Sequence, residues 1–342
     1  MGLFDSDGRW QGFLACPLTP YDADGRVDAD VYAAQIEFLL AHGAPALCAL
    51  MHMAESLNLS WEERRLLASL TVEVAGDRAP VVVHVSCPGT DHTVELARHA
   101  ESAGAKGVVA VTPYHWRPGE EGLLQHFMAV AKSIEGALVA YTFPAALGVS
   151  ITPELAASLI ERAPNFLAIK EASHHLPTFA ELAQVAAELR PELSVFSGVD
   201  YMLANRVCGG AGTFSACAVV APRLVGALWE AVANDDLAGA LPIQDRVSRL
   251  LGPLLRAYPA TIKAAAEIMG RPLGPTRLPT PPLSAGQRAG LAVELDRAGL
   301  LDDEPYGWDP GAGPDPERAR RQAGITAPAV SGDVHPDPRR TP

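Results

Sequence analysis

Lysine is scarce in this chain of 342 residues. Only Lys106, Lys132, Lys170 and Lys263 occur, and arginine supplies most of the positive charge. Lysine and arginine together number 27, against 40 aspartates and glutamates, which leaves a formal net charge of −13. This charge argues against a nucleic-acid backbone or an anionic membrane as the partner, because either would be repelled. A small anionic substrate stays possible, because its binding depends on the charges inside its site and not on the net charge of the whole protein.

Cysteines are few and long apolar runs are absent. The five cysteines are Cys16, Cys48, Cys87, Cys208 and Cys217, and no two of them form a CxxC pair. This spacing is typical of a reduced, intracellular protein without a structural zinc. No apolar run approaches the ~18 residues of a membrane span. The first ten residues lack the basic and apolar regions of a signal peptide. We therefore expect a cytoplasmic protein.

Short apolar runs alternate with longer amphipathic ones. These runs are rich in Val, Ala, Leu and Phe without polar alternation, which is typical of strands that are buried on both faces of a parallel sheet. The predicted strands are 12–16, 46–51, 80–86, 107–112, 137–143, 166–170, 193–198 and 212–216. The predicted helices between and after them are 27–43, 59–76, 90–105, 119–134, 152–163, 177–189 and 220–234.

This alternation predicts an α/β fold, a (β/α)8 TIM barrel over residues 1–234. A doubly wound open sheet is the alternative, but it usually carries a glycine-rich phosphate loop after its first strand. Here the first strand continues into CPLTPYDADG, which has no GxGxxG pattern. We expect residues 235–301 to form further helices packed on the barrel. Residues 302–342 are rich in Pro, Gly and charge, which predicts a disordered tail.

Active-site residues of such barrels project from the carboxyl ends of the strands. Lys170 ends the predicted sixth strand, and Tyr141 lies at the equivalent height on the fifth. A partly desolvated lysine has a lowered pKa, so its neutral amine can attack a ketone and form a Schiff base. The Tyr141 phenol could move the protons. A lysine that snorkels or pairs with Glu171, and a tyrosine bonded to a carbonyl, are the structural alternatives.

Several motifs carry a family resemblance. They are TPYHWRPGEEGLLQHF (112–127), YTFP (141–144), FLAIKEAS (166–173), GGAGTFSACAVVAP (209–222) and RLPTPPLS (277–284). Their order and spacing from about Gly12 to Leu301 resemble the dihydrodipicolinate synthase / N-acetylneuraminate lyase family. The resemblance implies a metal-independent class I lyase without a cofactor, which acts on pyruvate or another 2-oxo acid and on an aldehyde. It also implies that Lys170 is the Schiff-base lysine, that Tyr141 relays protons, and that the protein is a dimer or tetramer.

The sequence departs from the family at its substrate contacts. The family's G-T-T-G-E loop reads Met51-His52-Met53-Ala54-Glu55, and His115 replaces the second tyrosine of its TPYY motif. We expect His52 and His115 to take over carboxylate binding or proton transfer, unless they only fill space. Ala146 replaces an arginine that would pair with a second carboxylate, so dihydrodipicolinate synthesis is not expected. The predicted substrate-binding residues are His52, Met53, His115, Phe143, Ser173 and Phe214.

Three functions therefore stay open beside a general lyase that makes or breaks a C–C or C–O bond. The apolar Met51, Met53, Trp116 and Phe143 favour a hydratase-aldolase with a bulky or aromatic substrate, although ordinary packing explains each residue alone. A barrel that binds a 2-oxo acid without catalysis would explain the altered loop. A metal-dependent hydrolase could use the strand-end histidines His52, His84, His115 and His174 as zinc ligands.

Overall fold

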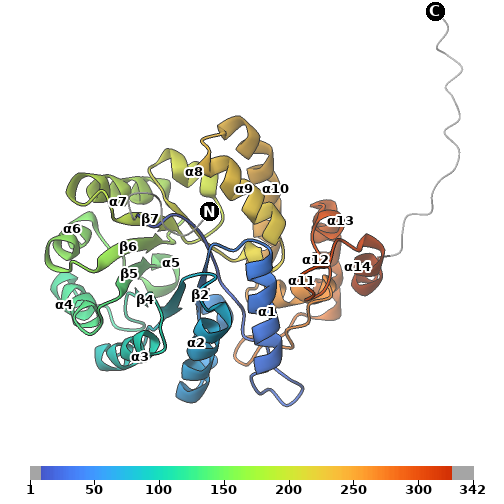
Figure 1. Ribbon diagram of the computed structural model, residues 1–342, viewed down its shortest axis with the longest axis horizontal. Helices are drawn as coiled ribbons and strands as arrows, with labels where there is room; N and C mark the ends of the chain where they lie inside the picture. The colour runs from blue at the N-terminus through green and yellow to red at the C-terminus, as the bar shows by residue number, and fades with distance from the viewer. Residues whose placement is uncertain (1–8, 326–342) are drawn as a thin grey trace, which may run out of the picture.

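The computed structural model describes residues 9–325 and contains a closed barrel of eight parallel strands in sequence order (Figure 1). The strands are β1 (Gly12–Ala15), β2 (Ala46–Ala49), β3 (Val81–His84), β4 (Gly107–Val111), β5 (Ala137–Thr142), β6 (Phe166–Glu171), β7 (Ser194–Ser197) and β8 (Gly212–Ser215). Pairing of β8 with β1 closes the barrel. Each predicted apolar run contains one strand, so the predicted TIM barrel is confirmed.

Helices surround the barrel on its outer side (Figure 1). They are α1 (Ala29–Ala41), α2 (Trp61–Ala75), α3 (Thr90–Ser102), α4 (Glu120–Ala131), α6 (Pro153–Arg162), α7 (Leu176–Leu189), α8 (Met202–Val207) and α9 (Pro222–Ala233). Ser60 and Glu63 cap α2 reciprocally, and the Thr152 side chain caps α6, as the sequence indicates. The six-residue α8 was not predicted, because it is too short to show a helical period. None of the described helices is long and apolar enough to cross a bilayer.

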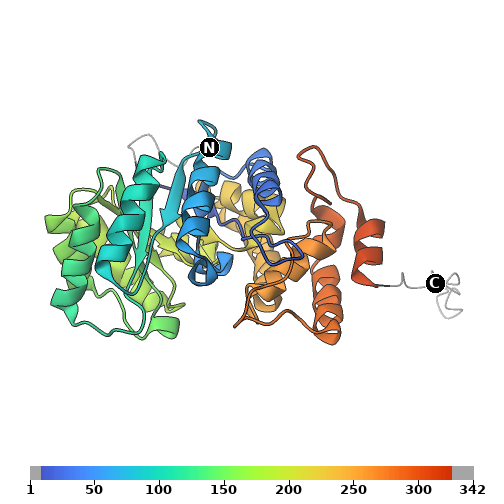
Figure 2. The same ribbon diagram turned by 90° about the horizontal axis from the view of Figure 1, so that it is seen from below.

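Five further helices follow the barrel: α10 (Leu237–Leu255), α11 (Ala260–Ile268), α12 (Ala285–Arg297), α13 (Leu300–Asp303) and α14 (Pro316–Ala323). Figures 1 and 2 both place α11–α14, coloured orange to red, at one side of the barrel. The predicted helical region after residue 234 therefore exists, and it extends past residue 301.

The prediction of a disordered tail from residue 302 is wrong for the part that the structure describes. Helix α14 is ordered, and its Ala319 is completely buried. Arg320 forms ion pairs with Asp296 of α12 and Asp302 of α13. Aliphatic residues are few here, so composition indicated disorder, but the helix docks through these ion pairs, through the buried Ala319 and through Ala323, which packs against the core. Residues 326–342 lie outside the described residues.

A buried ion pair connects the loop after β2 to the C-terminal helices. The ammonium of Lys263, in α11, lies 2.8 Å from a carboxylate oxygen of Glu55, and the two side chains are only 4% and 1% exposed. The other oxygen of Glu55 accepts a hydrogen bond of 2.8 Å from the backbone N–H of Arg277. The Tyr21 ring contacts both the Lys263 ammonium and the Arg277 guanidinium. Its centroid lies 4.2 Å from the Lys263 nitrogen and 4.3 Å from the central carbon of the guanidinium. The C-terminal region thereby holds the β2 loop in place.

We predict that Lys263→Met lowers the free energy of unfolding by about 3–5 kcal/mol, because it leaves the Glu55 carboxylate buried without its partner. The double variant Lys263→Met/Glu55→Gln should recover part of this loss. Arg249→Ala, which removes an exposed ion pair with Asp245, should cost less than about 1 kcal/mol. Denaturant unfolding followed by circular dichroism measures all three. Equal effects of the buried and exposed variants would contradict the prediction.

Candidate active site

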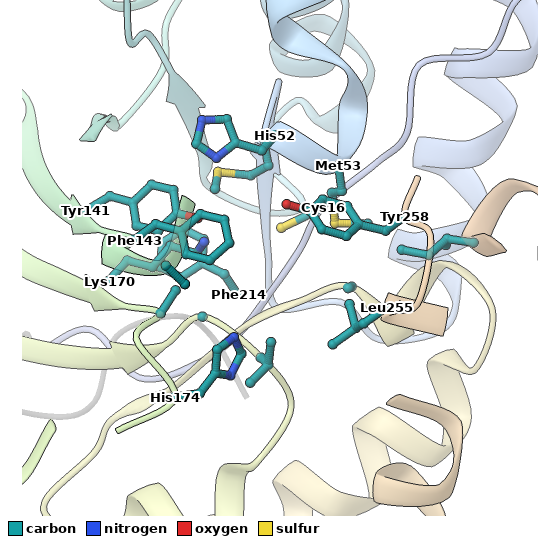
Figure 3. Close-up of a pocket in the computed structure, with 17 residues that line it drawn as sticks. Cys16, His52, Met53, Tyr141, Phe143, Lys170, His174, Phe214, Leu255 and Tyr258 are labelled. Atoms are coloured by element: carbon teal, nitrogen blue, oxygen red, sulfur yellow. The ribbon is translucent and has the colours of Figure 1, made fainter. Parts of the chain in front are cut away.

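The carboxyl ends of the strands open into a cavity of about 330 Å³. Six of the eight residues predicted for the site line it, and Figure 3 shows them. They are His52, Met53, Tyr141, Phe143, Lys170 and Phe214. Most of the other lining side chains are apolar. The barrel therefore presents one amine in a mainly hydrophobic chamber.

Lys170 lies at the base of this cavity and is 4% exposed. It forms no ion pair in the described part of the chain, since the neighbouring Glu171 binds the backbone N–H of Ser173 instead. Desolvation by burial is the main cause that lowers the pKa of Lys170 to about 8. An unpaired, buried amine of this kind is partly neutral near neutral pH and can act as a nucleophile.

Tyr141 is the direct neighbour of Lys170 across the β5–β6 pairing. The Lys170 nitrogen lies 3.6 Å from the centroid of the Tyr141 ring, and 5.4 Å from that of Phe214. The aromatic faces stabilise the ammonium through cation–π attraction without supplying a counter-charge. Burial raises the pKa of Tyr141 well above its ordinary value, so the phenol is protonated and can donate a proton.

His52 forms a cluster with Tyr114 and His84 above the amine. Its Nε2 atom lies 2.7 Å from the Tyr114 hydroxyl, and its ring meets His84 edge-on with centroids 4.8 Å apart. Burial lowers the pKa of His52 to about 3, helped by the positive charges of Lys170 and Arg64. The His52 imidazole is therefore neutral at physiological pH. It can exchange hydrogen bonds with a substrate, but it cannot offer a positive charge.

His84 on β3 is fully buried. Its Nδ1 atom lies 2.9 Å from the Leu50 carbonyl oxygen, and because a carbonyl only accepts, Nδ1 carries the proton. Its Nε2 atom is then an acceptor, and it has no partner in the described part of the chain. Burial lowers the pKa of His84 well below its ordinary value. The two histidines are thus a neutral pair.

The loop that carries His52 and Met53 is held from two sides. Residues His52–Ala54 form a single 3₁₀ turn, and Glu55 ends it with a φ of 56°, in the left-handed region. The Thr19 hydroxyl donates a 2.6 Å hydrogen bond to the Ala54 carbonyl. Glu55 itself binds Lys263. The glutamate that this loop shares with the family motif therefore fixes the loop and does not reach the cavity.

Two predicted site residues do not line the cavity. His115 is exposed, and its ring contacts that of Trp116, which is 61% exposed. The Ser173 hydroxyl accepts a hydrogen bond from the His175 backbone N–H, and Ser173 is not among the lining residues. Both residues follow a strand end in the sequence, but the chain turns outward before it reaches them.

The lining residues that were not predicted to contact substrate include Cys16, His174, Leu255, Tyr258 and Ile262. Leu255, Tyr258 and Ile262 belong to the α10–α11 junction, which covers one side of the cavity (Figure 3). Helical periodicity in the sequence gives no signal that this junction faces the barrel. Helices α10 and α11, which are additions to the eight βα units of the barrel, therefore form part of the cavity wall.

The described residues offer no set of zinc ligands for the alternative of a metal-dependent hydrolase. Within residues 9–325, no group of three or more His, Cys, Asp or Glu side chains is placed to hold a metal ion. His52 and His84 lie close together, but His115 is on the surface. The strand-end histidines thus do not converge as that alternative requires.

A closed (β/α)8 barrel with a buried lysine beside a tyrosine, and no ion-pair partner for that lysine in the described chain, has the arrangement that a lyase of the class I aldolase type requires. The comparisons with known proteins agree. Residues 9–298 match the model of the Dihydrodipicolinate synthetase family. The chain belongs to this family.

Curated relatives and solved structures support this assignment. The chain is 34% identical over 294 residues to the 4-hydroxy-tetrahydrodipicolinate synthase of Acidiphilium cryptum, which covers 85% of this chain and 99% of the relative. The dihydrodipicolinate synthase structure from Thermotoga maritima superposes with a TM-score of 0.82 at 30% identity, covering 85% and 99% of the two chains. YagE from E. coli K12, solved in complex with pyruvate, superposes with a TM-score of 0.81 at 28% identity, covering 85% and 99%.

The names of these relatives conflict with one expectation. Ala146, in place of an arginine, argued against dihydrodipicolinate synthesis, but the curated relatives carry the name of that synthase. The expectation that this chain is not such a synthase is therefore not confirmed. It rested on a single missing contact, that of an arginine at position 146, whereas the relatives match along nearly the whole chain. The lyase class is unaffected.

We predict that the rate of imine formation at Lys170 rises with pH through about 8 and then levels off. The neutral amine is the nucleophile, and a pKa of about 8 makes roughly a tenth of it neutral at pH 7. Single-turnover trapping of a 2-oxo acid at pH values from 6 to 10 measures this. A logarithm of the rate that still climbs with nearly unit slope between pH 8 and pH 9 would mean that Lys170 keeps its ordinary pKa.

Proposed function

We propose that this protein forms an imine between Lys170 and a 2-oxo acid, with pyruvate the first choice, and joins it to an aldehyde or splits the product. The carrying observation is the buried Lys170 amine, which lacks a counter-ion in the described chain and lies against Tyr141 at the base of a cavity. The pyruvate complex of YagE supports pyruvate as the 2-oxo acid.

The chemistry follows from the amine. Neutral Lys170 attacks the ketone carbon, water leaves, and a protonated imine forms. The imine withdraws electrons, so the neighbouring methyl group loses a proton and becomes an enamine carbon that can attack an aldehyde. Tyr141 is placed to move protons during imine formation, since it adjoins the amine. Hydrolysis of the imine releases the product and restores Lys170.

His52 is our candidate for the carboxylate of the 2-oxo acid. It lines the cavity next to Met53, where the family motif has two threonines that are absent here. Because its pKa is about 3, it binds as a neutral hydrogen-bond donor, with its orientation fixed by the bond to Tyr114. His115, which is exposed, would act only across an interface between subunits. A dimer or tetramer and a cytoplasmic location stay predictions.

The lining of the cavity favours a bulky or aromatic aldehyde. Met53, Phe143, Leu255 and Ile262 surround the space beside Lys170 and bind apolar groups well. Hydratase-aldolase chemistry on such a substrate is therefore the finer assignment that we propose. The names of the curated relatives favour a second candidate, synthesis of the dipicolinate precursor from an aldehyde that carries its own carboxylate.

Borohydride trapping with pyruvate tests the imine. We predict one covalent adduct, located on the Lys170 peptide by mass spectrometry and absent from Lys170→Ala. Lys263 is an internal control, because it is equally buried but paired with Glu55, and its peptide should stay unmodified. An adduct on Lys263, or none on the folded protein with pyruvate or longer 2-oxo acids, would refute the proposal.

An aldehyde panel then separates the two candidates. Benzaldehyde and larger aromatic aldehydes should condense with pyruvate faster than short aldehydes that carry a carboxylate. The opposite order would assign the synthase reaction to this chain. Installing an arginine as Ala146→Arg should shift the preference toward the carboxylate-bearing aldehydes, because its guanidinium can bind a carboxylate through two hydrogen bonds.

A further inference from the structure

A second, smaller cavity adjoins the active-site cavity. Its volume is about 160 Å³, and its lining comes from the carboxyl ends of β6 and β7, the loops that follow them, and the helices α7 and α8. These two helices contact each other and β7, as Figure 1 shows. His174, which is labelled in Figure 3, and Val199 line both cavities, so these two residues stand between them. An occupant of the smaller cavity therefore contacts the wall of the active site.

Glu171 supplies a buried carboxylate to the smaller cavity. It is the last residue of β6, and because side chains alternate along a strand, it points away from the barrel interior that Lys170 faces. Glu171 is 4% exposed, and its carboxylate accepts a 2.7 Å hydrogen bond from the Ser173 backbone N–H, but it has no ion-pair partner in the described part of the chain. Burial raises the pKa of this carboxyl, although the nearby His174 and His175 oppose the rise. Buried carboxylates are rarely left without a cation.

Asn205 supplies a second polar group. It lies on α8, lines the smaller cavity and is 7% exposed. Its side-chain amide forms no hydrogen bond within the described part of the chain, although buried amides normally have a partner. Its amide oxygen can accept a hydrogen bond, as the Glu171 carboxylate can. The smaller cavity therefore offers two buried acceptors, one of them charged, whose bonding capacity the described residues do not use up.

The remaining lining suits a small cation that carries an apolar part. It includes the aromatic residues Phe179 and Tyr201 and the aliphatic residues Leu176, Val199 and Ala204. Aromatic faces attract ammonium groups, and aliphatic side chains accommodate a short carbon chain. An anion would be repelled by Glu171, and a neutral hydroxyl would leave the charge of its carboxylate uncompensated. A primary ammonium group neutralises this charge and donates hydrogen bonds to both acceptors.

We propose that the smaller cavity binds the primary ammonium group of a small amine, with Glu171 as its counter-ion and Asn205 as a hydrogen-bond acceptor. This site is separate from the one that we assign to the 2-oxo acid and the aldehyde. The inference goes beyond the proposed function and does not depend on it, because binding of the amine is non-covalent and needs no chemistry at Lys170.

Ethylammonium is the probe, and saturation-transfer difference NMR on the full chain at pH 7 and constant ionic strength measures its Kd. We expect saturable binding with a millimolar Kd, which is the range that a ligand of so few atoms reaches. Glu171→Gln, which keeps the shape and removes the charge, should weaken binding more than about 10-fold. Asn205→Leu should weaken it about fivefold, because the acceptor is lost. Asn205→Asp should tighten it about fivefold, because a second carboxylate is added.

Asn234→Asp is the matched control, because it adds the same charge at an exposed position at the end of α9. It should leave the Kd within about twofold, since solvent and salt screen an exposed charge. Circular dichroism compares the folding of the variants. If Glu171→Gln does not fold, the two Asn205 variants decide, because they should move the Kd in opposite directions.

Three results would overturn the proposal. The first is no saturable binding of ethylammonium to the unchanged protein. The second is an equal Kd for the unchanged protein, Glu171→Gln and both Asn205 variants. The third is equally tight binding of 1-propanol or of potassium ions, which would mean that the cavity recognises a hydroxyl group or an inorganic cation instead of an amine.

Discussion

One buried ammonium, that of Lys170, has no counter-ion among residues 9–325, and the chemistry that we propose for this site depends on it. Removing a charge from water costs free energy unless the charge is paired. Burial therefore favours the neutral amine and lowers the pKa of Lys170 to about 8. The surrounding structure keeps it that way. Parallel strands bury the lysine at the barrel mouth, aromatic rings replace carboxylates around it, and Glu171 is occupied by the Ser173 backbone. The lowered pKa of Lys170 therefore depends on its burial and on the lack of a nearby free carboxylate among the described residues, as well as on the amine itself.

Lys263 shows what the same residue does when it is paired. Both lysines are 4% exposed, and burial lowers the pKa of each. Lys263 meets the Glu55 carboxylate, which favours its charged form, so it serves as a structural tie. That tie reaches the active site, because Glu55 ends the turn that presents His52 and Met53. The paired lysine holds the loop, whereas Lys170, which has no counter-ion among the described residues, is the amine that we propose as the nucleophile.

The barrel could be predicted from the sequence, because its signals are local. The eight apolar runs and the amphipathic stretches between them each report on a few neighbouring residues. Lys170 and Tyr141 followed from the rule that strand ends face the site. Tyr258 could not be found this way, since its place depends on how α10 and α11 pack across the barrel mouth. His115 was misplaced for a related reason, because one turn of backbone decides whether a strand-end residue points inward. The ordered α14 was missed because its docking uses ion pairs that composition alone counts as signs of disorder.

Where the family motif has two threonines, this site carries the imidazole of His52 and the thioether of Met53, and the imidazole has a geometric consequence. An imidazole at position 52 fills space that a threonine would leave open, and it binds Tyr114 and packs against His84. The His52 and Tyr114 side chains are thereby bonded to each other, whereas the Nε2 atom of His84 has no partner in the described part of the chain. Tyr258, between α10 and α11, also lines the cavity. Its hydroxyl group enters from the wall opposite Tyr141 (Figure 3). The cavity therefore takes its polar groups from the C-terminal helices as well as from the strands, and the way these helices pack across the barrel mouth decides part of its shape.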